Sequence, residues 1–62
     1  METAPLEHKL KQAVLDELRR QAENSDGELT VRDMGEDRLS VAGTIDLGDL
    51  VMVITGSVAG GP

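Results

Sequence analysis

The sequence contains no cysteine, phenylalanine, tryptophan or tyrosine. Without cysteine, the chain has no disulfide, no thiolate nucleophile and no cysteine-ligated zinc site. Without aromatic side chains, it has no platform on which nucleic-acid bases could stack. A hydrophobic core must therefore be built from eight Leu, six Val, two Ile, three Met and five Ala.

The charge of the chain is acidic and unevenly distributed. Twelve acidic residues against six basic ones give a formal net charge of −6. Residues 25–49 carry seven acids and two arginines, whereas residues 50–62 carry no charge. Because acidic chains repel a phosphate backbone, we expect no nucleic-acid binding. The same charge would attract a basic protein, which is one partner that the sequence suggests.

At 62 residues, the chain makes one small domain with a limited core. A domain of about 60 residues buries only about 60% of its unfolded surface, and such scaffolds usually need a disulfide, a metal or a partner subunit. The uncharged C-terminal stretch is shorter than the roughly 20 apolar residues that cross a membrane, so we expect no membrane partner. The N-terminus lacks the basic flank and apolar run of a secretory signal, so we expect a cytoplasmic location.

Residues 4–23 predict an amphipathic helix. Thr3 is a candidate N-cap and Pro5 lies in the first turn, where its missing N–H has no cost. The segment Asn-Ser-Asp-Gly at 24–27 is typical of a helix end followed by a turn. The apolar stripe follows the helical period. Its residues are Leu6, Leu10, Ala13, Val14, Leu18 and Ala22.

Residues 28–42 predict a β-hairpin. Leu29 and Val31 alternate with polar residues, as do Leu39 and Val41, and Gly35 begins a short polar turn between them. We expect the apolar face of the hairpin to pack on the helix stripe. Because a two-stranded hairpin alone is marginally stable in water, this segment again indicates a need for a partner element.

Residues 44–58 form an apolar segment that fits two structures. One is a helix with Asp46 as its N-cap. The other is a buried strand, since the run from 51 to 55 is rich in β-branched residues. The predicted fold is therefore α+β with the order α-β-β-α, or alternatively α-β-β-β, followed by a flexible tail at 59–62. The helical face consists of Leu47, Leu50, Val51, Ile54 and Val58.

Either structure of 44–58 leaves apolar side chains uncovered within one chain. Burying a Val or Met side chain contributes about 1.5–3 kcal/mol, so several exposed ones are a substantial loss for a marginal domain. A symmetric homodimer removes this loss, because the same patch meets itself. We therefore expect a homodimer. The predicted assembly interface consists of Leu50, Val51, Met52, Val53 and Ile54.

No arrangement of residues indicates catalysis or metal binding. His8 is the only histidine, and its helical neighbours offer neither an acid nor a nucleophile for a relay. Asn24, Asp26 and Glu28 alternate like the first three ligands of a calcium loop. However, Leu29 stands where the loop needs glycine, and Gly35 stands where it needs a bidentate glutamate. We therefore predict no enzymatic activity, no cofactor and no metal, and a small acidic interaction module.

The C-terminal segment resembles one known family. Residues 48–54, Gly-Asp-Leu-Val-Met-Val-Ile, and residues 58–61, Val-Ala-Gly-Gly, are similar to the final strand and tail of the ubiquitin-like sulfur carrier proteins of thiamine and molybdopterin synthesis. The resemblance implies that Gly60 and Gly61 form a tail whose terminal carboxylate is adenylated and converted to a thiocarboxylate. It also implies that Pro62 is trimmed first. The alternative function is therefore a sulfur-carrier-like protein.

Overall fold

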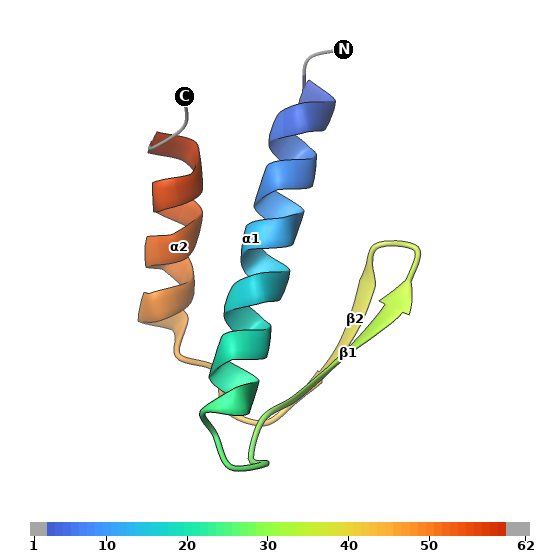
Figure 1. Ribbon diagram of the computed structural model, residues 1–62, viewed down its shortest axis with the longest axis vertical. Coiled ribbons are helices and arrows are strands. Elements are labelled where there is room, and N and C mark those ends of the chain that lie inside the picture. Colours follow the sequence, from blue (N-terminus) through green and yellow to red (C-terminus); the bar gives the residue numbers. More distant parts are fainter. Residues whose placement is uncertain (1–2, 60–62) are drawn as a thin grey trace.

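The computed structural model describes residues 3–59, which form two helices and two strands (Figure 1). Helix α1 spans Thr3–Glu23, strand β1 Thr30–Gly35, strand β2 Arg38–Ala42 and helix α2 Leu47–Ala59. This order confirms the predicted α-β-β-α fold of the α+β class. It also excludes the strand alternative for the run 51–55, which lies within α2.

The described part of the chain is flat, with extents of 38 × 25 × 13 Å along its principal axes. Helix α1 lies in the middle, α2 lies along one of its flanks, and the hairpin lies on the other (Figure 1). The two helices run antiparallel, and α2 contacts neither strand. The hairpin is therefore an insertion in the connection between two packed helices, and the three units meet along two seams instead of around a common core.

Complete burial is limited to one corner of this layer. Among residues 6–58, the buried apolar side chains are Leu18, which is 5% exposed, and Leu29, which is 2% exposed. Leu18 lies in the last turns of α1, and Leu29 immediately precedes β1 at the base of the hairpin. Leu50, Val53 and Ile54 of α2 are only half-buried, because a single layer leaves both of its faces open to solvent.

The chain reverses after α1 through a turn held by one serine. The Ser25 hydroxyl donates to the carbonyl of Ala22 at 2.8 Å and accepts from the N–H of Leu29 at 2.9 Å. Asp26 and Gly27 both adopt positive φ, at 56° and 87°, which turns the chain sharply between these contacts. The turn thereby places Leu29 against the end of α1.

The hairpin exits at Gly43, where only glycine fits. Its φ is 126°, a conformation that side-chain-bearing residues rarely adopt. A β-carbon at this position would lie 2.8 Å from the Cα of Leu29 and would also collide with the backbone of Glu28. Gly43 therefore permits the close crossing of two chain segments at the buried corner.

The hairpin is antiparallel, with Val31 opposite Val41 and Asp33 opposite Leu39. Since side chains alternate between the faces of a strand, these four share the face that includes the groove-lining Asp33 and Leu39. The expected packing of this face on the helix stripe is only partly observed. Strand β1 contacts α1 but β2 does not, and Leu39 and Val41 are each 37% exposed. Part of the apolar face of the hairpin therefore stays uncovered by α1.

Candidate functional site

The largest set of exposed apolar side chains on one element lies on α2. Each is at least half exposed, and together they form what we call the α2 outer face. Residues 47, 51 and 58 lie along one side of the helix, and residue 52 lies about a third of a turn away from them. The α2 outer face consists of Leu47, Val51, Met52 and Val58.

The five residues predicted to form an assembly interface are divided between the two sides of α2. Val51 and Met52 belong to the outer face. Leu50, Val53 and Ile54 are half-buried, and α1 is the one element that α2 contacts. A continuous run of five residues covers more than a full helical turn, so no single face can hold all of them. Whether Val51 and Met52 contact a partner stays a prediction.

Helix α2 begins at Leu47, directly after Asp46, which is confirmed as its N-cap. The N–H of Asp49 donates to Asp46 Oδ1 at 3.0 Å, and the N–H of Leu50 donates to the Asp46 carbonyl at 3.2 Å. Gln21 of α1 clamps the same residue from the other side. Its Oε1 accepts from the N–H of Asp46 at 2.7 Å, and its Nε2 donates to the Asp46 carbonyl at 3.1 Å. The start of α2 is thus fixed directly to the end of α1.

A buried carboxylate supports this clamp. Glu17 is 5% exposed, and Gln21 Nε2 donates to its Oε2 at 2.8 Å. Arg20 binds Glu17 in a bidentate manner, with Nε–Oε1 and Nη2–Oε2 distances of 2.8 and 2.6 Å, and its Nη2 also reaches Asp49 Oδ2 at 3.3 Å. The hydrogen bonds from Arg20 and then Gln21 lower the pKa of Glu17 from 4.5 to about 2. Glu17 is therefore ionised throughout the neutral range.

Sequence reasoning did not identify this hydrogen-bonded contact between the end of α1 and the start of α2. The available signal was position: Glu17 and Gln21 are four residues apart and lie beside Leu18 on the apolar side of α1, where two long polar side chains need partners. Their partner Asp46 is 25 residues away from Gln21 in sequence, so no local pattern shows the contact.

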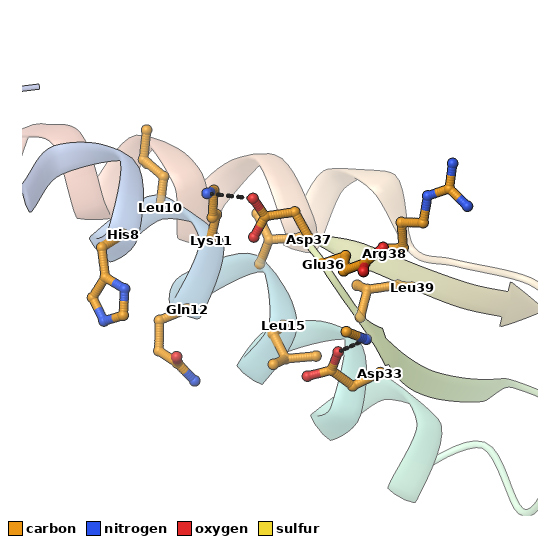
Figure 2. Close-up of a pocket in the computed structure, with 12 residues that line it drawn as sticks. His8, Leu10, Lys11, Gln12, Leu15, Asp33, Glu36, Asp37, Arg38 and Leu39 are labelled. Atoms are coloured by element: carbon orange, nitrogen blue, oxygen red, sulfur yellow. Dashed lines mark hydrogen bonds and ion pairs between the residues drawn. The ribbon is translucent and has the colours of Figure 1, made fainter. Parts of the chain in front are cut away.

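A groove of about 550 Å³ lies between α1 and the hairpin (Figure 2). Leu10, Val14 and Leu15 line its helical wall, and Leu39 lines its strand wall. Lys11 Nζ and Asp37 Oδ2 lie 3.0 Å apart and bridge the two walls. This ion pair raises the pKa of Lys11, but both side chains are exposed, so it holds the walls together only weakly.

The candidate metal ligands stay dispersed in the part of the chain that the structure describes. Within residues 3–59, no group of three or more His, Asp or Glu residues is placed to hold a metal ion. His8 is exposed at one end of the groove and forms no side-chain hydrogen bond with another described residue. The absence of enzymatic activity stays a prediction, as does that of nucleic-acid binding.

No protein-family model matches the chain, and no curated protein or solved structure shows significant similarity to it. Gly60 and Gly61, the tail implied by the resemblance to sulfur carriers, lie outside the described residues. Residues 48–54, which the resemblance equates with a strand, lie in α2. Over residues 3–59, neither helix has the length and apolar character needed to cross a membrane.

Proposed function

We propose that this protein is a small, acidic, non-enzymatic assembly module of the cytoplasm that forms a homodimer through the α2 outer face. The single observation that carries the proposal is the exposure of four large apolar side chains on one helix, whereas only two apolar side chains are buried among residues 6–58. Monomeric proteins expose single apolar residues routinely, but a contiguous set is typical of an interaction site.

Charge favours α2 over the other surfaces as the meeting point of two copies. Each copy has a formal net charge of −6, so most encounters bring like charges together. Helix α2 contains a single charged residue, Asp49, and Arg20 of α1 binds its carboxylate. Two copies that meet through α2 therefore bring almost no charge repulsion into the contact.

The expected affinity is modest. Burying a side chain that is half exposed contributes about 1 kcal/mol, so the eight side chains of two outer faces contribute at most about 8 kcal/mol before the costs of association. Those costs are at least about 4 kcal/mol, so the surplus is at most about 4 kcal/mol and corresponds to a dissociation constant of about 1 mM or weaker. The dimer should therefore become populated over protein concentrations from about 0.1 mM to about 5 mM.

The residues of α2 also favour an antiparallel dimer. Gly48, Met52 and Gly56 are spaced by four residues and form a line on the exposed side of the helix. In an antiparallel dimer with its twofold axis at Met52, Gly48 of one copy lies opposite Gly56 of the other. The two methionines then meet at the axis, between the two pairs of facing glycines. The notch at Gly56 is open, since a β-carbon there would contact nothing within 4 Å.

Sedimentation over this concentration range tests the dimer, with refractive-index detection because the chain has no aromatic chromophore. We expect the wild-type mass to rise towards two chains and the Met52→Glu variant to remain a folded monomer. Ser40→Glu adds the same charge at an exposed site on β2 and should dimerise like the wild type. A wild-type mass of one chain throughout, or an unchanged dimer in Met52→Glu, would refute the proposal.

Disulfide cross-linking tests the orientation, because the chain has no cysteine of its own. In an antiparallel dimer, a mixture of Gly48→Cys and Gly56→Cys should form the mixed disulfide, whereas each variant alone should cross-link poorly. Ser40→Cys serves as a control for random collision. Efficient disulfides within each variant alone would indicate parallel helices and would contradict the antiparallel arrangement while leaving the dimer itself intact.

A further inference from the structure

We propose that the groove between α1 and the hairpin binds a basic amphipathic segment of another protein. This proposal concerns a surface separate from the α2 outer face, because no residue of α2 lines the groove. It does not depend on the proposed dimer. The two surfaces lie on opposite flanks of α1 (Figure 1).

The walls of the groove are apolar and incompletely covered. Figure 2 shows Leu15 projecting from α1 on one side and Leu39 coming from β2 on the other. Leu39 and Val41 retain 37% exposure although they lie on the strand face that looks towards α1. The volume of about 550 Å³ lies within the range of sites that enclose ligands and is large enough for several side chains. An apolar helix face or a short apolar strand would cover these walls.

The rim supplies the charge that selects the partner. Asp33, Glu36 and Asp37 line the hairpin side of the groove. Arg38 extends away from Leu10 and Leu15 in Figure 2, so it does not neutralise the interior. Lys11 neutralises one carboxylate through its exposed contact with Asp37. The remaining acids favour lysine or arginine on the incoming segment.

The same charges argue against a second copy as the occupant. The hairpin and its flanks belong to residues 25–49, which carry seven acids and two arginines. Another acidic chain would bring like charges to the groove, whereas a basic amphipathic segment matches both its apolar walls and its acidic rim. Recognition of an amphipathic segment by an apolar groove is a common mode of peptide binding.

The test uses the full chain labelled with nitrogen-15 and two synthetic peptides of about 18 residues, or five helical turns. One peptide places Leu and Lys at amphipathic helical spacing, and the other replaces every Lys with Glu. We expect the Lys peptide to shift the amide resonances of Leu10, Val14 and Leu39 but not that of Met52, and we expect the Glu peptide not to bind. Shifts centred on α2, or equal binding of both peptides, would overturn the proposal.

Two variants separate the local rim from the overall charge. Glu36→Lys should weaken binding of the Lys peptide about fivefold, as expected for loss of a contact at the rim. Glu23→Lys makes the same charge change outside the groove and should weaken binding less than twofold. Asp33→Asn keeps an oxygen for the N–H of Gly35 and should also weaken binding. Equal losses at Glu36 and Glu23, or groove resonances that shift on dilution of the free protein, would contradict a heterologous basic partner.

Discussion

Replacing Gly43 with alanine should destabilise the fold more than any other glycine-to-alanine change among the described glycines. The first contribution is conformational, since a φ of 126° costs a side-chain-bearing residue about 1–3 kcal/mol. The second is steric. The new β-carbon would lie 2.8 Å from the Cα of Leu29, and backbone atoms on both segments must move apart to admit it.

The steric contribution matters because Leu29 is the most buried apolar side chain. Removing a buried leucine side chain costs about 2–5 kcal/mol, and a partial displacement forfeits part of that amount. Together the two contributions give an expected loss of about 3–5 kcal/mol. A chain of this length has a total stability of about 3–9 kcal/mol, so Gly43→Ala should lose about half of it or more.

Urea unfolding followed by the helical circular dichroism signal measures this loss, since the chain has no fluorescent side chain. The protomer concentration is held constant because association would add to the apparent stability. Gly27→Ala is the matched control: its φ is 87°, but a β-carbon there contacts nothing within 4 Å. It should lose only about 1–2 kcal/mol. Equal losses in the two variants would show that the crossing of chain segments at Gly43 is not tight.

Two further predictions concern α1. Leu18→Ala should lower the free energy of unfolding in urea by about 2–5 kcal/mol, because Leu18 is buried. Leu39→Ala, at the partly exposed wall of the groove, should lower it by only about 1 kcal/mol. Equal losses would contradict the placement of the core. Acid should weaken the fold between pH 4.5 and about 2, because in this interval unfolded Glu17 takes up a proton that the folded carboxylate does not. Glu17→Gln should lose stability at neutral pH and show a smaller decline on acidification, and an undiminished decline would contradict the low pKa of Glu17.

The sequence predicted the first helix and the hairpin because their local patterns were strong. The stripe on α1 has a clear helical period, and the hairpin has alternation around a glycine-containing turn. The segment 44–58 was ambiguous, since Val51, Val53 and Ile54 suit a strand as well as a helix. Asp46 as N-cap was the local signal for the helix, and its clamp by Gln21 is a tertiary contact that local reasoning cannot see.

The arrangement of the elements was harder to predict for a physical reason. The apolar stripe of α1 could have been covered by the hairpin or by α2, and sequence periodicity does not say which element takes it. In the structure, α1 contacts α2 on one flank and β1 on the other, and a groove lined by Leu10 and Val14 of the stripe remains between α1 and the hairpin. Only Val51 and Met52 of the predicted interface are exposed on α2. The position of α1 decides which side of α2 is buried, and the sequence does not give that position.

The flatness of the molecule has a consequence for its tolerance of substitution. In a single layer, most side chains touch water, and changes at such positions usually alter stability little. The demanding positions gather in one corner, at Glu17, Leu18, Gln21, Leu29 and Gly43. Substitutions along either flank can therefore accumulate while that corner keeps the fold, so both surfaces proposed to bind partners can change without loss of the fold.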